Sequence, residues 1–199
     1  MVVRKGDSGG PSISLGAIAG RLRPLSAARG DHAPGLAADG WFNSAHQVYP
    51  YGVLIAMARV DADTGAVTLE RALIAYDIGR AINPMLVRGQ IMGGFAQGLG
   101  GALLEEFLYD AQGQPLSVTF ADYLMPTLRD MPPVEMLLTE DAPSPRNPLG
   151  IKGAGESGVS AAGAVIASAV EDAISMPGAI RQLPITPMRL RKILREGRP

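Results

Sequence analysis

Apolar residues follow two different spacings along this chain, and each spacing predicts a different element. Residues 52–60 (GVLIAMARV) and 66–76 (AVTLERALIAY) are rich in β-forming side chains and flank the Asp/Gly turn DADTG, which predicts a β-hairpin. Asn83-Pro84 then offers a helix N-cap followed by proline at the first helical position. This pair and the apolar residues after it predict a long, mostly buried helix from about Met85 to Phe107.

Shorter elements are predicted before and after these by the same criteria. They are a short helix near Ser14–Leu22, a second hairpin at 107–120 with Gly113 in its turn, a strand at Val134–Thr139, an Ala/Val-rich helix at Ser160–Ile174 and a basic helix that begins at Thr186-Pro187 and runs through Leu194. We divide the chain into an irregular N-terminal segment, residues 1–40, and one domain, residues 41–199. Hairpins and a mixed sheet, packed against a long Gly-rich helix and a C-terminal helix pair, predict an α+β fold.

The segment 142–158 (APSPRNPLGIKGAGESG) fits neither a strand nor a helix. Its prolines and glycines interrupt both periodicities, while Leu149-Gly150-Ile151 is too apolar for a solvated linker. We therefore expect an ordered, buried loop.

Composition limits the chemistry that the chain can perform by itself. The 199 residues include 18 Lys and Arg against 19 Asp and Glu, so the chain lacks the positive field of a protein that binds nucleic acid or acidic membranes. It has no cysteine, which excludes disulfides, thiolate zinc sites, iron–sulfur ligation and a thiol nucleophile. The apolar stretch Ile91–Leu104 is shorter than the roughly 20 residues that span a bilayer. The charged N-terminus lacks the apolar run of a secretory signal, so we expect no membrane partner and a cytoplasmic location.

Two glycine motifs match known signatures but lack their context. Gly6-Asp7-Ser8-Gly9-Gly10-Pro11 spells the nucleophile loop of trypsin-like proteases, yet only five residues precede it and leave no room for the catalytic His and Asp. Residues 153–158 (GAGESG) match the GxGxxG dinucleotide fingerprint. There a Pro-rich loop replaces the required strand, and Glu156 would face a bound pyrophosphate, so nucleotide binding is disfavoured.

Glu156 is nevertheless a candidate general base, because a glycine-built loop next to Ile151 and Val159 would hold it in place. Backbone amides and a following helix would favour the ionised carboxylate, whereas burial would raise its pKa. A surface glutamate at a helix start is the simpler interpretation, since helix starts favour acids for structural reasons. Both interpretations stay open.

Gln90 and Gln97 lie two turns apart on a face of the predicted long helix that is lined with glycine, including Gly93 and Gly94. Small residues allow close approach by another helix, or by a polar planar ligand that hydrogen-bonds to carboxamides. The two glutamines favour the ligand. His32 and His46 have no second ligand at a suitable spacing, so we expect no metal bound by protein side chains.

Six short motifs occur in an order that is specific as a set, although each is weak alone. They are VDADTG at 60–65, Asp77-Ile78-Gly79 before Ile82-Asn83-Pro84, Gly89-Gln90 with Gly93-Gly94 and Gln97-Gly98, Asp122-Tyr123 with Pro126, PSPRNPLG at 143–150 and KGAGE at 152–156. With this set, residues 40–190 resemble the C-terminal part of the molybdenum-binding large subunit of the xanthine dehydrogenase/aldehyde oxidase family. The resemblance is closest to the carbon monoxide dehydrogenase-like branch.

The resemblance implies an oxidoreductase, a molybdenum hydroxylase whose metal is held by a pterin, either molybdopterin or its cytosine dinucleotide form. It places Glu156 on the family's catalytic glutamate, a general base. It implies a cofactor site formed by the Gly-rich helix and the loop before Glu156, with Gln90, Gly93, Gly94, Gln97, Lys152, Gly153, Ala154 and Gly155 as its residues. The implied substrate is a small molecule: an aldehyde, an N-heterocycle or carbon monoxide.

The family's large subunit is several times longer than this chain, so the resemblance implies only half of an active-site pocket. We expect a C-terminal fragment or split subunit that is inactive without a complementary N-terminal chain. It would work in a hetero-oligomer whose partner subunits carry the iron–sulfur clusters and FAD. The alternative is a non-catalytic remnant or an assembly module of the same fold.

Overall fold

The structure is a computed structural model that describes residues 2–3, 9–37, 39–43 and 46–197. It divides the chain into two compact units, residues 1–43 and 44–199. That residues 41–199 form the functional domain stays a prediction. Half of the protease-like motif, Gly6-Asp7-Ser8, lies outside the described residues.

The N-terminal unit consists of short elements. Strands β1 (Val2–Val3) and β2 (Ser12–Ile13) pair antiparallel, and helix α1 (Leu15–Arg21) is followed by the 3-10 helix η1 (Ala27–Arg29). The Ser14 hydroxyl accepts a hydrogen bond from the amide of Ala17 at 3.1 Å, which caps the helix predicted there. No side chain described in this unit is buried, so the described part of the unit has no apolar core of its own.

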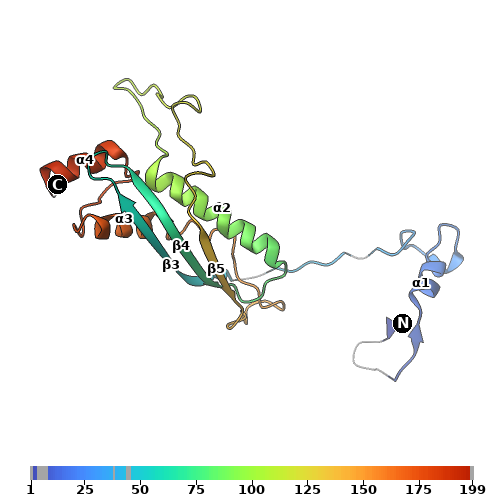
Figure 1. The fold of residues 1–199 in the computed structure, drawn as a ribbon. Helices are drawn as coiled ribbons and strands as arrows, with labels where there is room; N and C mark the ends of the chain where they lie inside the picture. The colour runs from blue at the N-terminus through green and yellow to red at the C-terminus, as the bar shows by residue number, and fades with distance from the viewer. Residues whose placement is uncertain (1, 4–8, 38, 44–45, 198–199) are drawn as a thin grey trace. The chain divides into compact units, whose positions relative to one another are not determined.

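The C-terminal unit contains a three-stranded mixed sheet of order β3-β4-β5 (Figure 1). β3 (Tyr51–Val60) and β4 (Val67–Asp77) form the predicted antiparallel hairpin. The Asp61 carboxylate accepts hydrogen bonds from the amides of Asp63 and Thr64 and closes the turn. β5 (Val134–Thr139) has its predicted bounds and runs parallel to β4, so both strands end at the same edge of the sheet.

A β-bulge in β4 sets which side chains face the core. Met57 pairs with Arg71 and Ala58 pairs with Leu69, which leaves Glu70 as the extra residue. As a result Leu69 and Ala72, three positions apart, are both buried, together with Ile74 and Tyr76 further along the strand. One face of β4 therefore enters the core along its whole length.

Helix α2 (Pro84–Leu103) confirms the predicted long helix and its cap, because the Asn83 side chain accepts a hydrogen bond from the amide of Leu86 at 3.2 Å. It ends at Leu103 rather than near Phe107, since the next two amides both bond to the carbonyl of Gly100 and close the last turn. Its first two turns are largely exposed, so the prediction of a mostly buried helix holds only for its second half. Among the helices that the structure describes, none is long and apolar enough to cross a membrane.

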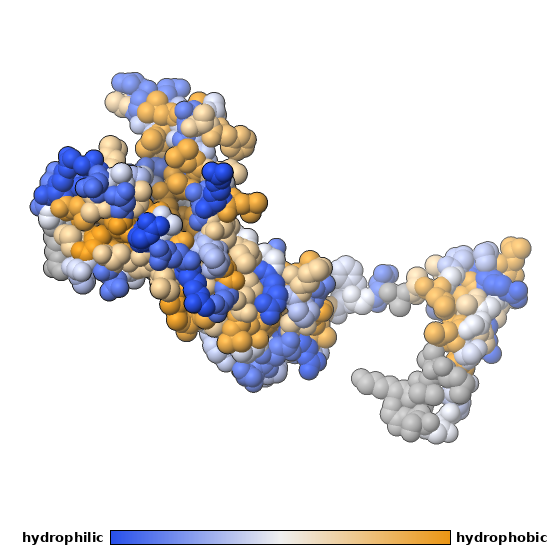
Figure 2. All heavy atoms as spheres, in the orientation of Figure 1, coloured by the Kyte–Doolittle hydropathy of each residue, from blue (hydrophilic) through white to orange (hydrophobic). Residues whose placement is uncertain are grey.

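The predicted hairpin at 107–120 is present only as a short antiparallel turn without regular strands. Tyr109 and Pro115 form an isolated antiparallel bridge, and Gly113 has a φ of +81° in the turn, as predicted. The amide of Leu116 donates to the carbonyl of Leu108 at 2.7 Å, and the Ser117 hydroxyl, which donates to the carbonyl of Glu106 at 2.9 Å, extends the contact. Many apolar side chains of this segment are exposed, and Figure 2 shows hydrophobic residues at its surface. With no covering layer, its alternating pattern does not produce strands.

Helices α3 (Ala162–Ala173) and α4 (Pro187–Glu196) confirm the two predicted C-terminal helices. Helix α3 packs on β3 and on α2, as Figure 1 shows. The core is formed by the inner face of the sheet and the apolar sides of these helices: Leu69, Ala72, Ile74, Tyr76, Ile78, Ile91, Phe95, Leu99, Ala102, Ala162, Ile166, Val170, Ile185 and Leu190. This arrangement confirms the predicted α+β fold.

Candidate functional site

The loop 140–161, which carries Glu156, begins where the parallel strands β4 and β5 end. Asp77 is the last residue of β4 and Thr139 is the last residue of β5, so the two side chains meet at one edge of the sheet. The loop is ordered by many hydrogen bonds, as predicted. It is buried only in part, because Ser157 is buried whereas Glu156 beside it is exposed.

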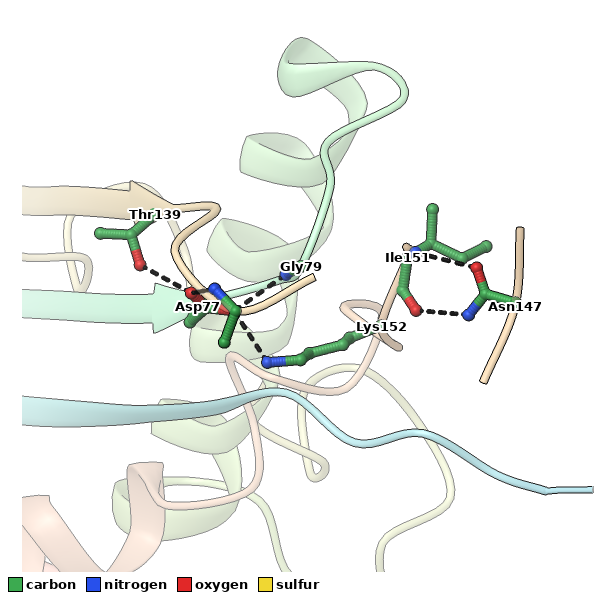
Figure 3. A network of polar contacts seen from close by, with 7 residues as sticks. Asp77, Gly79, Thr139, Asn147, Ile151 and Lys152 are labelled. Atoms are coloured by element: carbon green, nitrogen blue, oxygen red, sulfur yellow. Dashed lines mark hydrogen bonds and ion pairs between the residues drawn. The ribbon is translucent and has the colours of Figure 1, made fainter. Parts of the chain in front are cut away.

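Asp77 ties three segments together at this edge (Figure 3). Its Oδ1 accepts hydrogen bonds from Lys152 Nζ at 2.8 Å and from the amide of Gly79 at 3.0 Å. Its Oδ2 accepts from Thr139 Oγ1 at 3.2 Å and from the amide of Ala142 at 3.0 Å. These bonds, above all the one from Lys152, hold the pKa of Asp77 far below its usual range although burial opposes them. Asp77 is therefore a buried anion that fixes the start of the loop and its middle to the sheet.

Lys152 is committed to the same network. Its side chain is 9% exposed, and its ammonium group lies 4.3 Å from the centre of the Tyr51 ring as well as against Asp77. Its backbone amide donates to the carbonyl of Ile78 at 3.0 Å. The structure thus shows Lys152 holding the loop to the sheet, and a contact between Lys152 and a cofactor stays a prediction.

A second network shapes the loop between its two attachments to Asp77. The Asn147 side chain bonds to both backbone groups of Ile151, accepting from the amide at 3.0 Å and donating to the carbonyl at 2.8 Å (Figure 3). Gly150 has a φ of +70°, which disfavours any residue with a Cβ atom. The loop therefore reaches Lys152 in one defined conformation.

The next part of the loop lies directly on helix α2. A Cβ atom at Gly158 would lie 2.6 Å from the amide nitrogen of Phe95 and would overlap with the carbonyl of Ile91. A Cβ atom at Gly94 would lie 3.1 Å from the amide nitrogen of Val159, and one at Gly98 would overlap with Ala162. Of the two explanations for the small residues, close packing is thus the one observed at Gly94 and Gly98. The chain's own loop and the start of α3 take that place.

Glu156 lies on the outer side of this loop and is exposed. Its carbonyl accepts hydrogen bonds from the Ser160 hydroxyl at 2.8 Å and from the amide of Val159 at 3.2 Å, which forms a turn. Helix α3 begins only at Ala162, so Glu156 precedes the helix and is not in its first turn. The expectation of a buried loop is corrected at this residue: Gly158 packs against α2, whereas Glu156 is exposed.

The structure brings Gln90 to this loop. A Cβ atom at Gly155 would lie 3.8 Å from Gln90 Nε2. Gln97 is exposed two turns further along α2, and Gly93 faces open space. Gly153, on the other side of Gly155, donates its amide to the carbonyl of Val48 at 3.3 Å.

The same turn contains several hydrogen-bond donors that have no partner among the described residues. The amides of Gly155 and Glu156 make no hydrogen bond within the part of the chain that the structure describes. The Ser157 hydroxyl is buried and likewise has no partner among these residues. The sequence analysis missed Ser157, since no pattern in the glycine-rich loop indicates that the serine turns inward. Together with the Gln90 carboxamide, these groups suit a ligand rich in hydrogen-bond acceptors.

No group of three or more His, Cys, Asp or Glu side chains within the described ranges is arranged to hold a metal ion. The donors at the Glu156 turn are amides and a hydroxyl, which are poor metal ligands but good partners for the polar groups of an organic cofactor.

Comparison with known proteins gives a consistent picture. Residues 9–132 match the family model of the molybdopterin cofactor-binding domain. The chain is 47% identical over 178 residues to subunit gamma of the 6-hydroxypseudooxynicotine dehydrogenase complex of Paenarthrobacter nicotinovorans, which covers 89% of this chain and 22% of the relative. It is 35% identical over 161 residues to the carbon monoxide dehydrogenase large chain of Afipia carboxidovorans, which covers 80% of this chain and 20% of the relative.

Two solved structures share the fold. Quinoline 2-oxidoreductase from Pseudomonas putida 86 aligns with a TM-score of 0.69 at 42% identity and covers 74% of this chain and 19% of that chain. The Cu,Mo-CO dehydrogenase in its carbon monoxide reduced state aligns with a TM-score of 0.76 at 33% identity and covers 85% of this chain and 21% of that chain. The chain spans about a fifth of the length of the relatives that it matches.

Proposed function

We propose a function from the premise that this chain belongs to the molybdopterin cofactor-binding domain family, as the C-terminal part of a molybdenum-binding large subunit. On this premise it forms one wall of the active site of a molybdenum hydroxylase, and Glu156 is the general base. One observation carries the proposal: the exposed carboxylate of Glu156 lies in a turn with free amides, beside Gln90 and on a loop that is fixed to the sheet.

The residues present fit a pterin cofactor. Its polar groups would be held by Gln90, the amides of Gly155 and Glu156, and the Ser157 hydroxyl. Buried hydroxyl groups normally have a hydrogen-bond partner, so the unpartnered Ser157 hydroxyl supports the binding of a ligand at this position. Gln97 and Gly93 would extend this binding edge along α2, whereas Gly94 and Lys152 act by holding the loop in place. When bound, the cofactor supplies the two-electron redox chemistry. The proposed cofactor is molybdopterin or its cytosine dinucleotide form.

Glu156 would accept a proton from the nucleophile as it attacks the substrate. A carboxylate performs this step when it lies within hydrogen-bond reach of that proton and its position is fixed. Gly158 seated against Ile91 and Lys152 bound to Asp77 fix the loop on both sides of Glu156. Exposure in this chain agrees with a pocket whose other wall comes from the rest of the large subunit.

We further propose a nitrogen-containing organic substrate. The relatives named for 6-hydroxypseudooxynicotine dehydrogenase and quinoline 2-oxidoreductase are 47% and 42% identical to this chain, against 35% and 33% for the carbon monoxide dehydrogenases. The electrons would leave through partner subunits that carry iron–sulfur clusters and FAD. A cytoplasmic location stays a prediction.

The proposal is tested in a hybrid subunit, defined as the Paenarthrobacter subunit gamma with its matching segment replaced by this chain and produced with the other subunits of that complex. We expect Glu156→Gln to keep the molybdenum content, measured by elemental analysis, and to lower kcat for 6-hydroxypseudooxynicotine roughly 100-fold to 10,000-fold. The matched control Glu196→Gln changes an exposed carboxylate on α4 and should leave kcat unchanged.

Two results would contradict the proposal. Turnover of the Glu156→Gln hybrid within a few-fold of the unsubstituted hybrid would remove Glu156 from its role as base. An assembled hybrid that contains no molybdenum would favour the alternative, a non-catalytic assembly module.

A further inference from the structure

The outer face of the sheet, opposite to the helices, is apolar and uncovered. Val53, Ile55 and Met57 of β3 are 58%, 54% and 55% exposed, and Leu137 of β5 is 57% exposed. These side chains alternate with residues that pack against the core, so they project from the opposite face. We call this set the outer sheet face.

Strand pairing makes these residues one continuous patch. Val53 pairs with Ala75, and Ala75 pairs with Leu137, so three apolar side chains form a row across all three strands. Ile55 pairs with Leu73 in the next row. Neighbouring side chains in such a row lie within contact distance.

A sheet that faces water on one side has polar residues at the outward positions, whereas a strand that is covered on both sides reads as a continuous apolar run. β3 reads GVLIAMA from Gly52 to Ala58, and the next polar side chain is Arg59. Charged side chains border the patch. Arg71 pairs with Met57 and Glu135 pairs with Leu73, so the exposed ion pair Arg71–Glu135 lies directly beside the apolar rows, and the exposed ion pair Arg59–Glu70 follows further along the hairpin. An apolar centre with a charged border is typical of a protein interface.

The patch also continues to the candidate site. Tyr51 is the first residue of β3 and lies two positions before Val53, so both side chains project from the same face. The ammonium group of Lys152 lies over the ring of Tyr51. A polypeptide that covers the outer sheet face therefore reaches the residue that holds the Glu156 loop.

We propose that the outer sheet face docks on the remainder of the molybdenum-binding large subunit, the part that this chain does not match. The relatives supply the occupant: 78% to 80% of their length lies outside the match, so a second layer for this sheet is available within the same subunit. This inference rests on the proposed function only for the identity of that subunit.

Thiol labelling in the hybrid subunit tests the docking. The chain has no cysteine, so Ile55→Cys introduces a single thiol at the centre of the patch. The matched control Asp63→Cys places a thiol in the exposed polar turn of the same hairpin. Alkylation is followed for each peptide by mass spectrometry, in the chain alone and in the hybrid. We expect the thiol at position 55 to react at least 100-fold more slowly in the hybrid, and the thiol at position 63 to change within a few-fold.

Val53→Cys, in the neighbouring row, is a second variant that replaces Ile55→Cys if Ile55→Cys folds poorly. We expect the thiol at position 53 to show the same protection in the hybrid. Three results would overturn the proposal. The first is equal reactivity of the thiols at positions 53 and 55 in the hybrid and in the free chain. Protection in the free chain that grows with chain concentration would identify a second copy as the occupant, and protection independent of concentration would identify residues 1–43.

The labelling result and the proposed function fail separately. Protection without molybdenum in the hybrid would leave the docking in place and contradict the cofactor site. Molybdenum binding and a Glu156-dependent turnover with both thiols reactive would contradict the docking alone.

Discussion

Asp77 and Lys152 carry opposite charges where water scarcely reaches them, with side chains 4% and 9% exposed. Such a pair costs desolvation free energy, so its value lies in the geometry that it enforces more than in the net free energy of folding. Here the geometry is the attachment of the Glu156 loop to the ends of β4 and β5. Loss of either partner leaves the other charge buried and unpaired.

Single and double substitutions separate these effects. We expect Lys152→Met alone to lower the free energy of unfolding at neutral pH by about 3–5 kcal/mol, and Asp77→Asn with Lys152→Met together to lower it by much less. Urea unfolding followed by circular dichroism measures both. The exposed pair Arg59–Glu70 is the control, because breaking it by Glu70→Gln should cost about 0–1 kcal/mol. Equal losses in the single and the double variant would contradict the buried-pair interpretation.

The same pair predicts a pH dependence. Folding lowers the pKa of Asp77, so its contribution to stability is complete above the unfolded carboxyl pKa of about 4 and declines as the pH falls below that value. We expect unfolding by urea between pH 5 and pH 3 to show a steeper loss of stability in the unsubstituted chain than in the Asp77→Asn, Lys152→Met variant. Parallel curves would show that Asp77 does not titrate differently in the folded state.

At single residues, the sequence predicts what local chemistry decides. Asn83 caps α2 and Ser14 caps α1 because their side-chain oxygens accept hydrogen bonds from amides of the first turn that have no partner within the helix. The inward turn of Ser157 and the outward position of Glu156 depend on how Gly158 packs against α2. That contact joins residues far apart along the chain, so no local pattern reveals it.

At the scale of elements, α2 has two kinds of glycine. Gly94 and Gly98 lie against the site loop and the start of α3, whereas Gly89 has open space where a Cβ atom would be. Glycine lowers helix stability relative to alanine, so the packed glycines are retained against a cost. The close approach of the Glu156 loop to the helix explains them.

Substitution by alanine distinguishes a glycine in open space, such as Gly89 of α2, from a packed glycine, such as Gly158 of the loop that lies on α2. Gly89→Ala should raise the free energy of unfolding by about 1 kcal/mol, because it only removes the helix penalty. Gly158→Ala should lower it by about 1–3 kcal/mol through overpacking against Ile91 and Phe95, and should lower kcat in the hybrid subunit by displacing Glu156. Thermal unfolding and steady-state kinetics measure the two effects. A Gly158→Ala variant as stable and active as the parent would contradict the packing.

The elements that the sequence predicts correctly are those with a regular spacing of apolar residues and another element to pack against. The hairpin β3–β4, strand β5 and helices α2, α3 and α4 all agree with the sequence pattern because each has a face in the core. The segment 107–120 has strand-like alternation but no layer to pack on, and it forms only one bridge. The end of α2 differs by four residues because Gly100 closes the helix with two amides at once.

At the scale of the whole molecule, this chain is about a fifth of the subunits that it resembles. Its donors for a cofactor are those of one loop turn and the neighbouring Gln90 on α2, and Glu156 in that turn is exposed. A cofactor bound only there would therefore remain largely in contact with solvent. We therefore expect the purified chain to contain no stoichiometric molybdenum, whereas the hybrid subunit contains it. Elemental analysis of both preparations decides the matter, and a full molybdenum complement in the chain alone would contradict this prediction.

The parallel pairing of β4 with β5 has a consequence for the order of folding. The hairpin β3–β4 joins neighbours in the chain, but β5 reaches β4 only after residues 78–133 have been passed, and closing so long a loop is slow. Asp77 meets Thr139 and Ala142 only once that strand has been added. The site loop is thus among the last parts of the protein to become structured. In molecules in which β5 has not yet paired with β4, the loop that carries Glu156 is not held in place.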